Sequence, residues 1–297
     1  MRDDLLAISE AAFSAQQQAR DTYPELVTPG SRPIAWFGDI SAYSASPLRI
    51  MTTGLNPSNI EFPDGDPDRR FPRASGVEDA GPKYVDSLNA YFTTDPYMKW
   101  FNTYRTLLEG LDASFDGSHG ANVAVHTDLF SPVPTSPTWS RLPSTARKEL
   151  AESGIALWHQ LVQALRPDVI LLSVAEKHLS VIDLPSRETG WKVLHTIEQR
   201  RAPYPVRTRA YHLNGHPILV AWGRAANTPF GSISYSARRE IGTAIRAATS
   251  NLRETGTKLI RADTNGGDLL SWRSRQAPGH LTASFPSSVK ADGRKEP

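Results

Sequence analysis

Polar side chains capable of acid, base or water-orienting chemistry follow two short apolar segments of the 297-residue chain. Asn56, in the sequence Gly-Leu-Asn-Pro-Ser, comes just after the β-like segment 48–53, and His126 and Asp128 come just after segment 122–125. An amide can hold and orient a water molecule, whereas imidazole and carboxylate groups can exchange protons or accept hydrogen bonds. We therefore expect any catalysis to depend on Asn, Asp and His side chains in loops.

A second loop that combines polar residues with proline spans 226–234 and includes Asn227, Phe230 and Ser232. It follows the last predicted strand. Loops after parallel strands gather at the carboxyl edge of a sheet, where ligands bind in open α/β folds. The two loops are therefore predicted to flank one cleft. A simpler interpretation of the first loop stays open, because Asn-Pro-Ser is a common turn and Ser58 can serve as a helix cap.

Apolar runs alternate with helical patterns, separated by turn residues, through the first 250 residues. This order predicts an α/β fold, a three-layer sandwich with a mostly parallel four-stranded central sheet flanked by helices. The clearest helix is 148–165, where Leu150, Leu157, Leu161 and Leu165 recur at helical spacing. Other helices are expected over 5–18, 84–91, 97–111 and 235–248, and strands over 48–53, 122–125, 168–173, 192–198, 207–213 and 217–222.

The chain is predicted to hold one such domain, over residues 1–250. Beyond residue 250 the apolar periodicity stops, and glycine, serine, proline and scattered charges prevail. That composition is typical of a flexible tail. We expect residues 251–297 to form this tail, with one docked segment, Leu269–Trp272.

The composition excludes several classes of chemistry. The chain has no cysteine, so it forms no disulfides, zinc–thiolate sites, iron–sulfur clusters or cysteine nucleophiles. It also lacks glycine-rich nucleotide-binding motifs, the Gly-x-Ser-x-Gly nucleophile turn and the His-Glu-x-x-His zinc helix. We expect neither a metal nor a cofactor. The longest apolar run, 169–174, is far shorter than the roughly 18 residues of a membrane span, and we expect a cytoplasmic protein without a signal peptide.

Residues 48–248 resemble the uracil-DNA glycosylase superfamily in the order and spacing of the two loops. Gly-Leu-Asn-Pro-Ser at 54–58 is similar to the family's first motif, as in Gly-Ile-Asn-Pro-Gly, and Asn-Thr-Pro-Phe-Gly-Ser at 227–232 is loosely similar to its late motif. The resemblance implies hydrolysis of an N-glycosidic bond in DNA, on a base turned out of the helix and without a covalent enzyme intermediate. It implies that Asn56 positions the attacking water and that Asn227 stabilises the departing base or holds the phosphate.

The resemblance also implies a set of base-binding residues. His126 and Asp128 lie where the family reads the base edge, and a carboxylate accepts from cytosine N4 but repels the corresponding carbonyl of uracil. Asp128 could equally cap a strand end or pair with an arginine. Phe71 is the expected stacking ring, with Phe62 second, although either could be an ordinary core residue. Ser58 replaces a tyrosine that blocks C5 substituents in the strict uracil enzymes, which predicts a pocket open to C5-bulky pyrimidines.

Two long loops, 59–82 and 131–144, are expected to wall this pocket, and Trp139, Arg141 and Lys83 would suit a sugar or a phosphate-rich neighbour. These features resemble the prokaryotic antiphage glycosylases of the superfamily, which remove glucosylated 5-hydroxymethylcytosine from phage DNA. That similarity implies a role in antiviral defence.

The late loop and the helix after it supply the expected DNA contacts. Phe230 is a candidate wedge that fills the space left by the flipped base, unless its ring folds back into the core. Ser232 lies in the same loop, and Arg238 and Arg239 at the start of the next helix are placed to meet phosphates. Double-stranded DNA is thus the expected partner.

Other functions remain open on the sequence alone. The chain could be a uracil or mismatch glycosylase of base-excision repair, or a non-catalytic module that binds modified DNA. It could also be an unrelated α/β hydrolase of small nucleosides. The basic residues around 187–209 favour DNA over the last of these.

Overall fold

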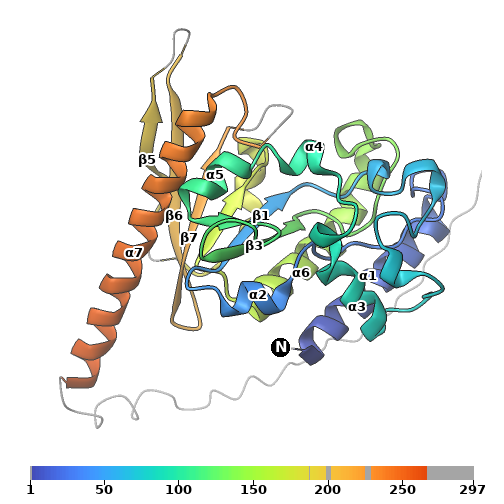
Figure 1. Ribbon diagram of the computed structural model, residues 1–297, viewed down its shortest axis with the longest axis horizontal. Coiled ribbons are helices and arrows are strands. Elements are labelled where there is room, and N and C mark those ends of the chain that lie inside the picture. Colours follow the sequence, from blue (N-terminus) through green and yellow to red (C-terminus); the bar gives the residue numbers. More distant parts are fainter. Residues whose placement is uncertain (1, 187, 199–201, 225–228, 266–297) are drawn as a thin grey trace, which may run out of the picture. The chain divides into compact units, whose positions relative to one another are not determined.

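The computed structural model describes residues 2–186, 188–198, 202–224 and 229–265 (Figure 1). Its contacts divide the chain into two units, Met1–Gly256 and Thr257–Pro297. The described part of the second unit is the continuation of helix α7 (Tyr235–Asn265). This helix extends well past its predicted end at residue 248, and the predicted docked segment Leu269–Trp272 lies outside the described residues.

The first unit is an α/β protein with a seven-stranded, mixed and mostly parallel sheet flanked by helices (Figure 1). The strands follow the order β2-β3-β1-β4-β7-β6-β5. From β2 to β7 each strand is parallel to its neighbour, whereas β6 is antiparallel to both β7 and β5. The strands are β1 (Ile50–Gly54), β2 (Ala113–Ser114), β3 (Asn122–Asp128), β4 (Val169–Leu172), β5 (Lys192–Ile197), β6 (Tyr204–Leu213) and β7 (His216–Gly223).

The prediction of a four-stranded sheet is wrong, because the sheet has a short extra strand at one edge and an antiparallel pair at the other. The direction of β6, antiparallel to β7, follows from a tight turn between these two strands. Asn214 and Gly215 both have positive φ, 51° and 77°, which is the geometry of a two-residue hairpin turn. Such a turn brings β6 back beside β7 in the opposite direction, so the sheet is mixed.

Seven α-helices and six short 3₁₀ helices lie in the described part of the chain. The α-helices are α1 (Arg2–Thr22), α2 (Ile40–Ala45), α3 (Pro82–Asn89), α4 (Met98–Phe101), α5 (Arg105–Gly110), α6 (Ser144–Leu165) and α7; the 3₁₀ helices are η1 (Asn59–Glu61), η2 (Pro63–Gly65), η3 (Pro72–Ala74), η4 (Tyr91–Thr93), η5 (Trp139–Arg141) and η6 (Glu176–Val181). None of the described helices has the length and apolar character that crossing a lipid bilayer requires.

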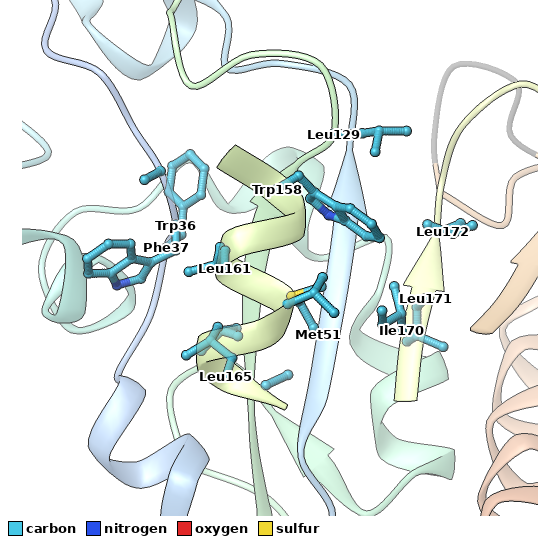
Figure 2. Packing of buried hydrophobic residues seen from close by; sticks show 14 of the residues in the cluster. Trp36, Phe37, Met51, Leu129, Trp158, Leu161, Leu165, Ile170, Leu171 and Leu172 are labelled. Carbon is cyan, nitrogen blue, oxygen red and sulfur yellow. The ribbon is translucent and has the colours of Figure 1, made fainter. Parts of the chain in front are cut away.

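Helix α6 confirms the predicted pattern, because its apolar face is buried. Figure 2 shows Trp158, Leu161 and Leu165 of this helix in one cluster with Met51 of β1 and the apolar residues of β4. Trp158 is 1% exposed, and burying a large apolar side chain stabilises the fold by about 1.5–3 kcal/mol. The helix ends at Leu165, and its capping residue Arg166 takes a left-handed φ of 47° before Pro167.

Gly154 allows α6 to approach the loop that follows β3. A Cβ atom at this position would overlap the backbone of Phe130 and lie 2.7 Å from the Cα of Ser131. Backbone atoms cannot move aside as a flexible side chain does, so only glycine fits. The close contact fixes α6 against the loop that leads from β3 into segment 131–144.

We therefore expect Gly154→Ala to destabilise the protein by about 2–4 kcal/mol, although alanine favours an isolated helix by about 1 kcal/mol. Denaturant unfolding would measure this loss. Ser153→Ala, one residue earlier in the same helix, is the matched control and should change the free energy of unfolding by less than about 1 kcal/mol. An unchanged stability for Gly154→Ala would contradict the close contact.

Candidate functional site

The pairing of β1 with its two neighbours brings the predicted site residues together. In the parallel register, Thr52 lies opposite His126 and Gly54 lies opposite Asp128. Asn56 follows two residues after the end of β1, and Ser173 follows the end of β4 on the other side. These groups therefore meet at the carboxyl edge of the parallel strands, where such sheets bind ligands.

A cavity of about 350 Å³ opens at this edge. At about 30 Å³ per water molecule it has room for roughly a dozen waters, and so for a ligand larger than the eight non-hydrogen atoms of a simple pyrimidine. Aromatic rings form much of its wall, and five sequence-predicted residues line it: Asn56, Ser58, His126, Asp128 and Trp139. The other lining residues are Phe37, Gly54, Leu55, Pro57, Ile60, Glu61, Tyr97, Trp100, Phe101, Thr138, Ser140, Ser173 and Pro229.

The side chain of Asn56 is held in one orientation. Its Nδ2 donates to the carbonyl oxygen of Pro57 and to Oγ1 of Thr135, both at 2.8 Å. Thr135 is fully buried, and its backbone N–H donates to the same Pro57 carbonyl at 3.2 Å. Because the amide hydrogens are used within the protein, Oδ1 is the atom of this amide left to accept a hydrogen bond from water.

Gly54 makes room for the carboxylate of Asp128. A Cβ atom at position 54 would lie 2.5 Å from Oδ1 of Asp128 and 3.3 Å from Nε2 of His126. His126 is anchored by a 2.7 Å hydrogen bond between its Nδ1 and Oγ1 of Thr52, and its Nε2 lies 3.6 Å from Oδ1 of Asp128. No arginine pairs with Asp128 among the described residues, so this carboxylate remains available to a ligand.

Ser58 has the role in the turn that its local sequence predicts. Its Oγ accepts from the backbone N–H of Ile60 at 3.3 Å and caps η1. The same residue lines the cavity, so its role as a helix cap does not remove it from the cavity wall.

The structure corrects the prediction that Phe71 stacks on a bound base. Phe71 is 2% exposed and packs on Phe62 and Tyr91, with ring centroids 5.6 and 5.4 Å apart. Neither Phe71 nor Phe62 lines the cavity. Both rings belong to the hydrophobic core, and the aromatic walls of the cavity come instead from rings such as Trp100 and Trp139.

The late loop contributes to the cavity through Pro229, while Asn227 lies outside the described residues. Phe230, the predicted wedge, is fully buried, and its ring occupies the space where Gly223 of β7 lacks a Cβ atom. The prediction of an exposed wedge is therefore wrong for this conformation. Ser232 is exposed and has a positive φ of 67°.

The two predicted phosphate-binding arginines are already engaged within the protein. Arg238 is 9% exposed, donates from Nη1 to the carbonyl oxygen of Thr103 at 3.1 Å, and lies 5.6 Å from the ring centroid of Tyr235. Arg239 is exposed and pairs with Glu109. Arg238 is thus a structural support and not an exposed phosphate ligand. No sequence pattern singled out Tyr235, which is 69% exposed and whose ring packs over Arg238.

Glu61 lines the cavity, although no sequence pattern indicated it as a residue of the site. It lies at the end of η1, is 6% exposed, and its Oε2 accepts from the hydroxyl of Tyr91 at 2.5 Å. Burial raises the pKa of this carboxyl to about 7, and the charge of Asp128 adds to the rise, against the lowering effects of Tyr91 and Arg70. Nothing in the local sequence signals this, because the groups around Glu61 come from distant segments.

The comparisons with protein families, curated proteins and solved structures found no match to this chain. Nor does the described part of the chain contain a group of three or more His, Asp or Glu side chains arranged to hold a metal ion. The site must therefore be interpreted from its own geometry.

The pKa of Glu61 predicts a pH-dependent stability. The carboxyl has a pKa of 4.5 in its ordinary state and about 7 when folded, so the folded protein binds the extra proton between these values and loses stability as the pH rises through them. Glu61→Gln, which stays neutral, should escape this loss. Its free energy of unfolding relative to the wild type should rise by about 2 kcal/mol between pH 5 and pH 8.

Denaturant unfolding at pH 5, 6.5 and 8 would test this, with Glu152→Gln on the exposed face of α6 as the control. The control should differ from the wild type by a constant amount across this range. If the free energy of unfolding of Glu61→Gln also differed from that of the wild type by a constant amount, the raised pKa of Glu61 in the folded protein would be contradicted.

Proposed function

We propose that this protein is a monofunctional DNA glycosylase that turns a modified pyrimidine out of the double helix and hydrolyses its N-glycosidic bond. The observation that carries this proposal is the convergence of Asn56, His126 and Asp128 on one cavity at the carboxyl edge of the sheet. The likeness of the two loops to those of the uracil-DNA glycosylase superfamily suggests a three-layer fold of that kind. It also suggests the reaction.

The arrangement suits a reaction in which the sugar carries most of the developing charge. As the bond between C1′ and the base breaks, its electron pair leaves with the base and the sugar becomes an oxocarbenium ion. A water then forms a bond to C1′ and gives up a proton, leaving an abasic site. Such a reaction needs a placed water and fixed dipoles more than a strong nucleophile. Asn56, oriented by Thr135 and Pro57, supplies the water-holding oxygen.

The cavity favours a cytosine-type base with a substituent at C5. The Asp128 carboxylate can accept from an exocyclic amine, and it would repel the carbonyl that uracil presents at the same place. The small side chain of Ser58 and the rings of Trp139 and Tyr97 border a volume larger than a pyrimidine needs. Aromatic rings commonly pack against sugars, so glucosylated 5-hydroxymethylcytosine is a fitting substrate. That substrate would place the protein in the cytoplasm, in defence against phage.

A DNA glycosylase with this site should lose its turnover when the water-holding amide is removed. We expect Asn56→Ala to lower the single-turnover rate at least about 100-fold and Thr135→Val to lower it about tenfold, because valine keeps the shape of threonine but not the partner of Nδ2. The substrates are duplexes with uracil, 5-hydroxymethylcytosine or its glucoside, followed by mild alkali to break abasic sites.

Ser153→Ala serves as the control for this experiment, because it lies on α6 away from the cavity lining. If no duplex or glucosylated phage DNA yields abasic sites or free base, the proposed activity is wrong. Cleavage of the uracil duplex alone would instead indicate a repair enzyme. Salt-sensitive binding without any cleavage would indicate a non-catalytic module.

The exposed ring of Tyr235 predicts a DNA contact beside the cavity. The ring packs over the guanidinium group of Arg238, which donates a hydrogen bond to the carbonyl oxygen of Thr103. Thr103 follows closely in the chain after Trp100, which lines the cavity. Stacking of one aromatic ring on a base contributes about 1–3 kcal/mol, so Tyr235→Ala should weaken DNA binding about tenfold. Tyr235→Phe should bind normally, as should Val193→Ala, which removes exposed apolar surface from β5. If Tyr235→Ala bound DNA as tightly as the wild type, the proposed contact would be contradicted.

A further inference from the structure

The side chain of Glu61 is placed to contact a bound ligand. Glu61 is only 6% exposed, yet it lines the same cavity as Asn56 and Asp128. One carboxyl oxygen, Oε2, is held by the hydroxyl of Tyr91 at 2.5 Å and lies 3.9 Å from Nε of Arg70. Among the described residues no group donates to or accepts from the other oxygen, Oε1. A buried carboxyl with one fixed oxygen and one unpartnered oxygen at a cavity wall is placed to contact whatever enters.

The surroundings of Glu61 keep its position fixed. Arg70 donates from Nη1 to the carbonyl oxygen of Asp95 at 2.7 Å and from Nε to that of Ile60 at 3.2 Å, and it lies 5.5 Å from the ring centroid of Tyr97. The hydroxyl of Tyr91 in turn accepts from the backbone N–H of Tyr97 at 2.9 Å. These contacts hold the carboxyl in place before any ligand binds.

Three titratable or charged groups act on this carboxyl, Tyr91, Arg70 and Asp128, and His126 lines the same cavity beside Asp128. Asp128 is the second carboxyl of the cavity and raises the pKa of Glu61 together with burial. Two nearby carboxyls in a poorly solvated space favour a state in which one is ionised and the other keeps its proton. The cavity then presents one acceptor and one donor.

We propose that protonated Glu61 donates to the ring edge of a cytosine-type base, at N3 or O2, while the carboxylate of Asp128 accepts from its N4 amino group. This assignment rests on the proposed glycosylase function and deepens it. Cytosine offers a donor at N4 and acceptors at N3 and O2, so the pair of carboxyls matches it. Uracil offers a carbonyl at C4 and a donor at N3, and the same pair opposes both groups.

The proton of Glu61 then has a part in the reaction. As the bond between C1′ and N1 breaks, its electron pair moves onto the base, and the proton on Glu61 Oε1 passes to N3 or O2. The base therefore leaves as a neutral molecule. The water held by Asn56 adds to C1′ and its proton returns to the Glu61 carboxylate or to solvent, which restores the starting state. A carboxyl that titrates near neutrality is well matched to both transfers.

The experiment measures binding and cleavage separately. DNA carrying a 2′-fluoro-5-hydroxymethylcytidine or its glucoside resists cleavage, and its affinity can be measured at pH 6 and pH 8. With a pKa of about 7, Glu61 is protonated roughly ten times more often at the lower pH, so the affinity of the wild type should fall about tenfold between them. Glu61→Gln keeps a donor that does not titrate, so its affinity should not change with pH.

Single-turnover cleavage of the unfluorinated DNA completes the test. The wild-type rate should fall above pH 7, whereas Glu61→Gln should be at least about tenfold slower at pH 6 and lack that decline, because an amide donates a hydrogen bond but not a proton. Glu152→Gln should behave as the wild type in both measurements.

Two outcomes separate this assignment from the glycosylase proposal. If the wild type cleaves DNA and Glu61→Gln shows the same rates and pH profile, Glu61 takes no part and the glycosylase proposal stands. If the wild type neither binds nor cleaves any of these duplexes, the glycosylase proposal is wrong and this assignment falls with it. Circular dichroism of each variant checks that the fold is kept.

Discussion

The parallel pairing of β1 with β3 is the constraint on which the site depends. Its register sets Gly54 opposite Asp128, and the missing Cβ of Gly54 leaves room for that carboxylate beside His126. A shift of one residue would turn every side chain of β1 to the other face of the sheet. The register is secured by the apolar core below it, where α6 packs on the neighbouring strands (Figure 2).

At the carboxyl edge of these strands, the chemistry of the site depends on how each polar side chain is buried and hydrogen-bonded. Asn56 is neutral and is tied to backbone and hydroxyl groups, so it orients without titrating. Glu61 is a carboxyl whose pKa is raised mainly by burial, with a smaller contribution from the charge of Asp128. A chain without cysteine, and without a metal-binding cluster in its described residues, thus gains donor and acceptor groups of different character from ordinary side chains.

The helices and strands that have a local sequence pattern could be predicted, whereas the burial and contacts of single side chains could not, because these depend on distant segments of the chain. Helix α6, strand β1 before the loop with Asn56, and strand β3, which ends at Asp128, have periodicity or turn residues of their own. The mostly parallel character of the sheet was predicted, but the antiparallel pairing of β6 with β7 was not, although Asn-Gly at 214–215 is a strong hairpin signal. The burial of Phe71 and Phe230 and the environment of Glu61 depend on partners such as Tyr91 and Gly223, which no neighbouring residue indicates.

The clamp that Thr135 and Pro57 place on Asn56 also bears on how the protein would tell its substrate from ordinary DNA. On the proposed function, the amide already has its working orientation in the free protein, so it would not need to rearrange when the correct base enters. A site that needs no rearrangement cannot select its substrate by induced fit. The protein would then select at an earlier stage, as a base leaves the duplex and enters the cavity, and most encounters with unmodified DNA would end there without reaching the chemical step.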